Sequence, residues 1–316
     1  MLPVELARRA EALQARLSAC DLCPHRCGVD RTTGVLGRCR VGAESRIASV
    51  CDHHGEEPAI SGTRGSGTVF AAGCNLRCLY CQNCQISQGA PDDFPGYPAE
   101  QLAAAFLSLQ QRGCHNVNWV SPTHVSAQLV AALALAIPRG FTLPIVYNSN
   151  GYDSLSALQL LDGIVDIYLP DLKYADADIA LRLSGAPDYP DVALAAIGEM
   201  YRQVGVLQLD EDDIARRGLI VRHLVLPHNL AGTREILRRL AAEVSPEVTV
   251  SLMAQYYPTH RAATLPELAR TITAAEYEEA IDAFAGAGLE NGWAQEPHEA
   301  PESYRPDFHA PHPFEQ

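Results

Sequence analysis

Residues 68–81 read Thr68-Val69-Phe70-Ala71-Ala72-Gly73-Cys74-Asn75-Leu76-Arg77-Cys78-Leu79-Tyr80-Cys81 and decide the fold of this chain. An apolar strand runs into a glycine and then into a loop with three cysteines at C-x3-C-x2-C spacing. Three thiolates on one loop can hold three irons of a [4Fe–4S] cube, whereas ordinary electron-transfer clusters take four cysteines. The remaining iron would lack a protein ligand, and an open metal position is where a substrate or cofactor binds.

Apolar runs and amphipathic stretches alternate from residue 67 onward. The candidate strands are residues 68–72, 116–120, 143–148, 164–170, 219–226 and 248–253. The candidate helices are residues 98–111, 125–136, 154–161, 175–183, 192–204 and 233–243, with a last one at 274–286. Such alternation predicts parallel strands joined by helical crossovers. The predicted fold class is therefore α/β, with an open, partial (β/α)6 barrel of the TIM type, because the units are too few to close the eight-stranded form.

The pattern also divides the chain into three parts. Residues 1–59 hold a short amphipathic helix to about Leu17 and then a Cys-, Gly- and charge-rich stretch, which we interpret as an N-terminal metal-binding segment. Residues 60–294 form the predicted barrel. Residues 295–316 are rich in Pro, Glu and His and are expected to be a flexible tail, whose His298 and His312 are solvated rather than metal-binding.

Composition limits the kind of partner. The chain has 316 residues, 47% of them apolar, which is typical of a soluble globular protein. No apolar run of about 18 residues predicts a membrane helix, and the N-terminus lacks the apolar core of an export signal, so we expect a cytoplasmic protein without membrane contact. Because 24 basic residues face 38 acidic ones, for a net charge of −14, a nucleic-acid partner is not expected.

The ten cysteines fall into two groups and two single residues. In the cytosol, reduced thiols ligate metals or do chemistry more often than they form disulfides. Four thiolates in the N-terminal segment predict a second metal site, and the spacing leaves zinc and a second iron–sulfur cluster both open; its members are Cys20, Cys23, Cys27 and Cys39. Cys51 and Cys114 are isolated, and we expect both to be small buried side chains.

Cys84 complicates the interpretation of the loop that holds Cys74, Cys78 and Cys81, because it adds a fourth cysteine and extends the spacing to C-x3-C-x2-C-x2-C. Four thiolates could close a zinc site or a purely electron-transferring cluster. The alternative function is therefore a non-catalytic iron–sulfur or zinc protein used in electron transfer or assembly. The two hypotheses differ in whether Cys84 is a ligand.

Polar residues follow the apolar cores of later strands. Asn148-Ser149-Asn150-Gly151 ends the third strand, Asp171 and Lys173 end the fourth, and Arg222 lies inside the fifth. Loops at the carboxyl ends of barrel strands build active sites, and a buried arginine must be paired. In the alternative interpretation Asp171 only caps the helix that begins near Ala175.

These stretches together resemble the radical S-adenosylmethionine superfamily, and in particular its pyruvate formate-lyase activating enzymes, over residues 65–257. The resemblance implies a [4Fe–4S] cluster on Cys74, Cys78 and Cys81. It implies reductive cleavage of S-adenosylmethionine to a 5′-deoxyadenosyl radical that abstracts a hydrogen atom from a substrate. It implies that the cofactor is bound by Asn148, Ser149, Asn150, Gly151, Asp171, Lys173 and Arg222. From their positions in the sequence we add the ring of Tyr80 and the hydroxyls of Ser121 and Thr123.

The resemblance also implies partners. An external one-electron donor of the flavodoxin or ferredoxin type would reduce the cluster, and the substrate could be a protein or peptide, such as a glycyl residue of a partner enzyme. The cysteine-rich preface, with Gly34 and Gly37, looks like the subgroup called pyruvate formate-lyase activating enzyme homologues, and so does His54-Gly55-Glu56-Glu57-Pro58. The catalytic residues and the substrate are not predicted.

The chain departs from that family at three places. The Gly-Gly-Glu that binds the cofactor's amino group is replaced by Ser121-Pro122-Thr123, so a carboxylate is lost. Asn148 stands where the activating enzymes have an acidic residue, and Gln255 with Tyr256 stand near an expected histidine. The superfamily resemblance survives these changes, but activation of pyruvate formate-lyase does not follow from it.

Several other titratable residues have two interpretations. His53, His54, Glu56 and Glu57 precede the first barrel strand, either as an exposed loop or as a carboxylate-bearing substrate site near the barrel mouth. His124 and His260 are interpreted as structural, since a satisfied histidine is commoner than a catalytic one.

Overall fold

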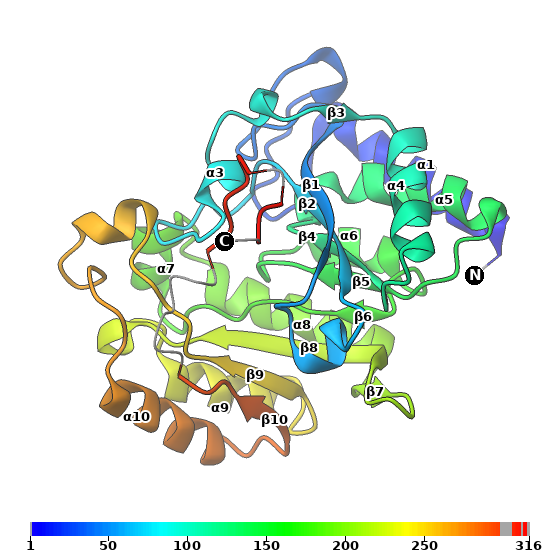
Figure 1. Cartoon of the computed structure of the whole chain (residues 1–316). Helices are drawn as coiled ribbons and strands as arrows, with labels where there is room; N and C mark the ends of the chain where they lie inside the picture. Colours follow the sequence, from blue (N-terminus) through cyan, green and yellow to red (C-terminus); the bar gives the residue numbers. More distant parts are fainter. Residues whose placement is uncertain (1, 298–304, 311, 315–316) are drawn as a thin grey trace.

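The computed structural model describes residues 2–297, 305–310 and 312–314. Its centre is one mostly parallel sheet (Figure 1). The strands are β1 (Ser45–His53), β2 (Ser66–Ala71), β3 (Gly96–Tyr97), β4 (Val117–Val120), β5 (Ile145–Asn148), β6 (Ile167–Tyr168), β7 (Gln208–Leu209), β8 (Ala215–Leu224), β9 (Thr249–Met253) and β10 (Asn291–Ala294). The α-helices are α1 (Pro3–Ala15), α2 (Pro58–Ser61), α3 (Cys84–Ser87), α4 (Ala99–Gln111), α5 (Ser126–Ala136), α6 (Leu155–Leu161), α7 (Ala177–Ser184), α8 (Tyr189–Val204), α9 (Thr233–Glu243) and α10 (Ala274–Ala285).

The parallel strands lie side by side in chain order. The sheet runs β10-β9-β8-β6-β5-β4-β2-β1-β3, and every pairing from β2 to β10 along this path is parallel. All six strands expected from the apolar runs are present, which confirms an α/β fold with a parallel sheet. Because the strands run the same way, their carboxyl ends meet at one edge, and the loops that follow them can share a site.

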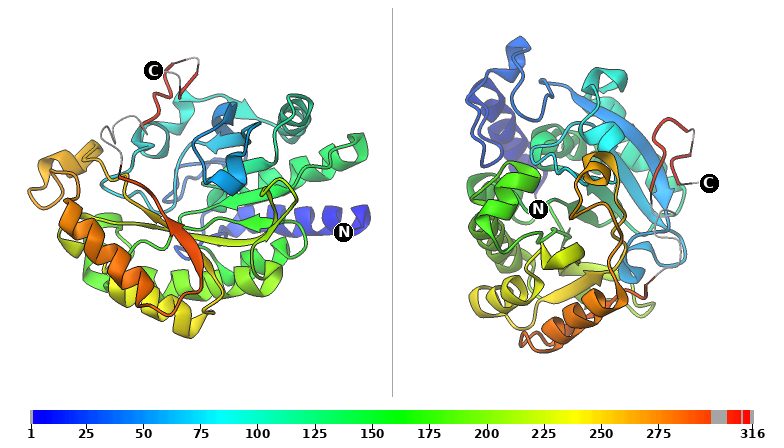
Figure 2. Two further views of the ribbon diagram at one scale, coloured as in Figure 1. Left: turned by 60° about the horizontal axis from the view of Figure 1, so that its bottom comes forward. Right: turned by 90° about the vertical axis from the view of Figure 1, so that its left-hand side faces the viewer.

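Helices cover one side of this sheet. α4 packs on β2 and β4, α8 packs on β6 and β8, and α1, α5, α6, α9 and α10 contact these helices and one another. The two views of Figure 2 show the sheet curving with the helices on its outer side. β2, β4 and β5 are buried along their whole length. No helix of the described residues is long and apolar enough to cross a lipid bilayer.

The N-terminal segment is joined to the sheet. β1 pairs with β2 in antiparallel register, with Val50 opposite Val69. Leu22 and Val41 are fully buried in the same core as the strands. β1 lies between β2 and β3 in the sheet and so joins the N-terminal segment to it. The division expected near residue 59 stays a prediction.

Part of the C-terminal segment packs on β2. Phe308 is buried, and its ring and that of Phe314 contact the ring of Phe70. Gln85 of α3 holds the segment through the Asp307 carboxylate and the Phe308 amide, and Figure 1 shows the red segment beside α3. The expected tail thus makes defined contacts at 305–310 and 312–314, whereas His298 lies outside the described residues.

Candidate functional site

A cavity of about 920 Å³ opens at the carboxyl ends of the parallel strands. It has the size of a site for a small molecule. Most of the residues predicted from the motifs line it: Cys74, Cys78, Tyr80, Cys81, Ser121, Asn148, Ser149, Asn150, Asp171, Lys173 and Arg222. Thr123 and Gly151 are not among its lining residues. The structure therefore brings the cysteine loop and four strand ends together.

The cysteine loop begins where β2 ends, and each of its first three thiols has a polar neighbour. The Asn150 amide donates to the Cys74 sulfur at 3.5 Å, and the Ser184 hydroxyl donates to the Cys78 sulfur at 3.1 Å. The Ser87 hydroxyl lies 3.2 Å from the Cys81 sulfur. Such partners stabilise and orient metal-bound thiolates. Ser87 and Ser184 escaped sequence analysis because nothing in their own segments marks them as partners of sulfur.

Burial shapes the acidity of this loop. It raises the pKa of the Cys81 thiol to about 12. Burial also raises the pKa of Cys78, although the Lys173 charge and the Ser184 hydrogen bond act in the opposite direction. Without a bound metal these groups are therefore thiols at neutral pH, and a metal must displace their protons. Among the described residues, no three His, Cys, Asp or Glu side chains are already arranged around one metal ion.

Cys84 is separated from this arrangement. It is the first residue of α3, is partly buried, and does not line the cavity. The other three cysteines of the loop do line it. The thiols of this loop that face the cavity are therefore those of Cys74, Cys78 and Cys81.

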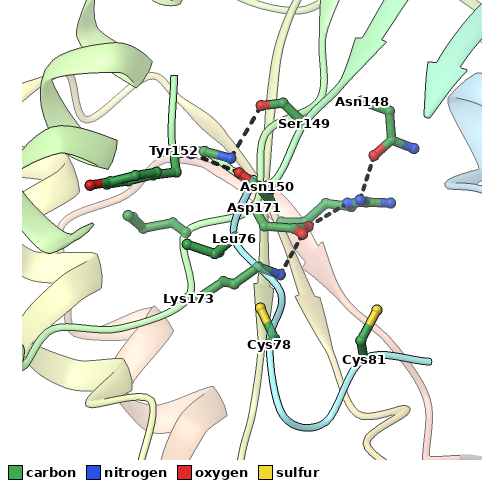
Figure 3. Close-up of polar contacts among 12 residues, drawn as sticks. Leu76, Cys78, Cys81, Asn148, Ser149, Asn150, Tyr152, Asp171 and Lys173 are labelled. Atoms are coloured by element: carbon green, nitrogen blue, oxygen red, sulfur yellow. Dashed lines mark hydrogen bonds and ion pairs between the residues drawn. The ribbon is translucent and has the colours of Figure 1, made fainter. Parts of the chain in front are cut away.

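Asp171 lies between two cations at the ends of β6 and β8. Its carboxylate accepts from Lys173 Nζ at 2.6 Å and from Arg222 Nε at 2.9 Å, and Arg222 Nη2 donates to Asn148 Oδ1 at 2.6 Å. Figure 3 shows this network above the Cys78 and Cys81 sulfurs. Burial alone would raise the pKa of Asp171, but the two cations hold it below its usual value. Burial lowers the pKa of Lys173, and Asp171 more than offsets this and leaves it raised. The alternative interpretation of Asp171 as a helix cap does not hold, because Asp176 caps α7.

A carboxylate from the β1–α2 loop completes this network. Glu56 lines the cavity, and its Oε2 lies 3.4 Å from Arg222 Nη1. Burial raises the pKa of Glu56 and of the neighbouring Glu57, against the opposing charge of Arg222. The interpretation of this segment as an exposed loop is therefore wrong for the two glutamates, since both are buried.

The turn after β5 is held by Asp153, which sequence analysis missed. The Asp153 carboxylate accepts from the hydroxyls of Thr123, Tyr147 and Ser149 at 2.7–2.9 Å. Thr123 thus stabilises the turn through Asp153 and does not itself line the cavity. Gly151 has a φ of +79°, and a Cβ there would collide with the Asp171 carbonyl oxygen. Only glycine lets the two strand ends approach so closely.

Tyrosines form the wall beside the cysteine loop. Tyr80 is buried and contacts the rings of Tyr174 and Tyr256 edge-on, with centroids 6.3 and 6.1 Å apart. The Tyr189 hydroxyl donates to the carbonyls of Asn150 and Asp171. Tyr189 thereby locks the two strand ends together, a role that its place in α8 did not reveal.

The histidines divide into structural and cavity-facing residues. His124 is buried, hydrogen-bonds the Ala72 carbonyl at 2.9 Å, and has its pKa lowered to about 4 by burial. It is structural, as predicted. His53 lines the cavity, and its ring packs against that of Phe314 with the ring centroids 3.8 Å apart. Burial, and to a smaller extent the charge of His54, lowers the pKa of His53 to about 4.

The N-terminal cysteines lie apart from the cavity. Cys20, Cys23 and Cys39 are buried and Cys27 is exposed. All ten cysteines of the chain are free, so no disulfide holds this segment. Cys114 is buried as expected, whereas Cys51 is only partly buried and lines the cavity beside Thr68.

The residues present fit an iron–sulfur cluster and a charged small molecule. Three thiols of the cysteine loop face the cavity, each with a polar neighbour, and Lys173 places a positive charge near Cys78. Iron–sulfur clusters bind through cysteine thiolates, and hydrogen bonds to sulfur tune them. The lining also offers paired cations and carboxylates, which suit a zwitterionic ligand.

Comparison with known proteins shows a similarity to an archaeal protein. The chain is 32% identical to the uncharacterized protein MJ0674 of Methanocaldococcus jannaschii over 270 residues, which are 83% of this chain and 73% of that protein. A scan against models of protein families finds no match. The name of MJ0674 assigns it no activity, so the similarity brings no reaction with it.

Proposed function

We propose that this chain, which belongs to the same family as the archaeal protein MJ0674, is a radical S-adenosylmethionine enzyme. One observation carries the proposal. The thiols of Cys74, Cys78 and Cys81 line a cavity together with the charged and amide side chains at the strand ends, and Cys84 does not line it. Three cavity-facing thiols on this one loop suit a cluster with one open iron better than a closed site made by all four thiolates of the loop.

The order of the strands supports a partial (β/α)6 barrel as the framework. The parallel strands follow one another in chain order from β2 to β9, with helices on the outer side. In barrels of this type active sites are built at the carboxyl ends of the strands, and the cavity lies at that end.

Cys74, Cys78 and Cys81 would hold the [4Fe–4S] cluster, since their sulfurs face the cavity. When bound, the cluster supplies the electron that cleaves S-adenosylmethionine into methionine and a 5′-deoxyadenosyl radical, which takes a hydrogen atom from the substrate. The protein excludes water from this chemistry, because Cys78 and Tyr80 are buried and Tyr80 packs against Tyr174 and Tyr256.

The strand-end residues would bind the cofactor by charge. Lys173 and Arg222 attract a carboxylate, and Asp171 orients both cations. The resemblance assigns Asn148 and the turn 149–151 to the methionine and ribose parts. Glu56 is the residue that compensates for the lost Gly-Gly-Glu carboxylate, because it lines the cavity and its 3.4 Å contact with Arg222 leaves it able to accept from an amino group.

The reaction needs two partners outside this chain. An external one-electron donor of the flavodoxin or ferredoxin type would reduce the cluster. The hydrogen donor would be a substrate that enters beside His53 and Glu56, which line the cavity. A glycyl residue of a partner protein is one such substrate.

A cysteine series tests this proposal. Each of Cys74→Ala, Cys78→Ala and Cys81→Ala, reconstituted anaerobically, should lose dithionite-dependent formation of 5′-deoxyadenosine and the corresponding iron. Cys84→Ala is the matched control from the same loop and should keep both. If Cys84→Ala loses the cluster as the other three do, the site is a closed four-thiolate centre and the proposal fails.

A further inference from the structure

We propose that the four cysteines of the N-terminal segment form a second thiolate–metal centre that braces the loop of the first. This N-terminal cysteine group consists of Cys20, Cys23, Cys27 and Cys39. The inference does not depend on the reaction proposed above, because it rests on different residues. Zinc and an iron–sulfur cluster both take four cysteine thiolates, and the experiment below separates them.

Two tight turns bring the group together. In one, the amides of Arg26 and Gly28 donate to the carbonyls of Cys23 and Cys20 at 3.0 and 2.9 Å. In the other, the Arg40 amide donates to the Gly37 carbonyl at 3.0 Å. Arg26 and Arg40, each adjacent to a cysteine, adopt positive φ values of 41° and 64°. Such strain persists only when the surroundings impose it.

The two turns touch at Cys27. The Arg38 amide donates to the Cys27 sulfur at 3.5 Å. A Cβ at Gly37 would lie 3.0 Å from that sulfur, so the turn fits against the cysteine without room for a larger residue.

The buried guanidinium of Arg31 is the strongest indication that the N-terminal cysteine group carries a negative charge. It is 1% exposed, and its guanidinium donates to the carbonyls of Gly42 and His124 and lies 3.8 Å from the Cys20 sulfur. No carboxylate of the described residues pairs with it. A buried guanidinium without an anion is costly. Four thiolates around a divalent core carry a net negative charge, which balances it.

The group also contacts the loop of the first centre. His25 Nε2 and Arg38 Nε lie 2.9 and 3.2 Å from the carbonyl oxygen of Asn75, the residue after Cys74. His25 stands between two cysteines of the group, and Arg38 precedes a third. A metal that fixes these turns therefore fixes the start of the Cys74–Cys81 loop as well. Because the thiols are not yet arranged around one point, binding and final ordering are coupled.

The test uses the full chain with the first centre removed. The background variant is Cys74→Ala/Cys78→Ala/Cys81→Ala, purified anaerobically and analysed for iron, zinc and acid-labile sulfide. We expect it to retain about one zinc, or about four irons with sulfide, per chain. Adding Cys27→Ser, which changes an exposed thiol, should lower the retained metal at least about tenfold, since metal sites depend on their ligands. Adding Cys114→Ser, a cysteine outside both groups, should leave it unchanged.

X-ray absorption on the background variant provides a second readout that needs no further substitution. Sulfur-only coordination supports the proposal, whereas oxygen or nitrogen ligands overturn it. A folded background variant without bound metal overturns it too, as does metal that persists after Cys27→Ser. If the N-terminal cysteine group holds metal but the wild-type protein cleaves no S-adenosylmethionine, the proposed function fails while this inference stands.

Discussion

Arg222 on β8 and Asp171 after β6 are joined both through their side chains and through their backbones. Arg222 Nε donates to Asp171 Oδ1 at 2.9 Å, and the residues also form a parallel bridge that extends the β6–β8 pairing. The ion pair is largely buried, with side chains 15–17% exposed, and Asp171 shares it with Lys173. It therefore fixes two cations at the cavity wall, where a carboxylate-bearing ligand can meet them.

Removing the shared carboxylate should be costly. Asp171→Asn leaves two buried cations facing each other, and breaking a buried pair costs about 3–5 kcal/mol of the free energy of unfolding. Urea denaturation of the wild type and the variant measures this loss. Glu235→Gln, which breaks an exposed pair with Arg238 on α9, is the control and should change nothing measurable. Equal losses in the two variants would contradict the account.

Glu56 should make stability fall as the pH rises. Burial raises its folded-state pKa above the ordinary value of 4.5, so between these two values the folded state keeps a proton that the unfolded state has lost. The free energy of unfolding then decreases as pH rises above 4.5. Glu56→Gln should flatten this slope in denaturation series from pH 4 upward, with the exposed Glu278→Gln as control. A steeper or unchanged slope in Glu56→Gln would show that the carboxyl is not desolvated.

His53 reports on the C-terminal segment. Its ring stacks on Phe314, and burial lowers its pKa to about 4. Phe314→Ala should uncover the ring and move its pKa up toward the ordinary value of 6.5. Titration of the histidine resonances by NMR, assigned with His53→Asn, measures the shift. A wild-type His53 that already titrates near 6.5 would mean that the segment does not cover it.

Gly151 should tolerate no side chain. Gly151→Ala adds a Cβ that would meet the Asp171 carbonyl oxygen, in addition to the strain of its φ of +79°. Gly113 has a similar φ of +84° but open space around it, so Gly113→Ala isolates the strain alone. We expect Gly151→Ala to lower the melting temperature more than Gly113→Ala and to weaken S-adenosylmethionine binding, as measured by calorimetry. Equal effects on both properties would show that the contact between the strand ends does not matter.

The sequence predicted the parallel strands β2, β4, β5, β6, β8 and β9 because each is a continuous apolar run followed by a helix-length stretch. β1 escaped because polar residues such as Arg46 and Asp52 interrupt it, so it lacks an apolar run. β10 escaped because Gly292 interrupts a four-residue strand and no apolar pattern remains.

The lining of the cavity was predictable for a different reason. Asn148, Asp171 and Arg222 stand at the carboxyl ends of parallel strands, and geometry brings such ends together. Residues that support the site through other residues had no recognisable sequence pattern. Asp153, Tyr189 and Arg31 each hydrogen-bond a partner that is distant in sequence, so no local pattern marked them.

Formation of 5′-deoxyadenosine by the wild-type protein is the decisive readout of the proposed reaction. The wild-type protein is reconstituted anaerobically with iron and sulfide, reduced with dithionite and given S-adenosylmethionine, and 5′-deoxyadenosine is quantified. We expect 5′-deoxyadenosine together with methionine, in amounts that depend on both reductant and cluster. A cluster-replete, folded protein that forms no 5′-deoxyadenosine would contradict the proposed radical chemistry.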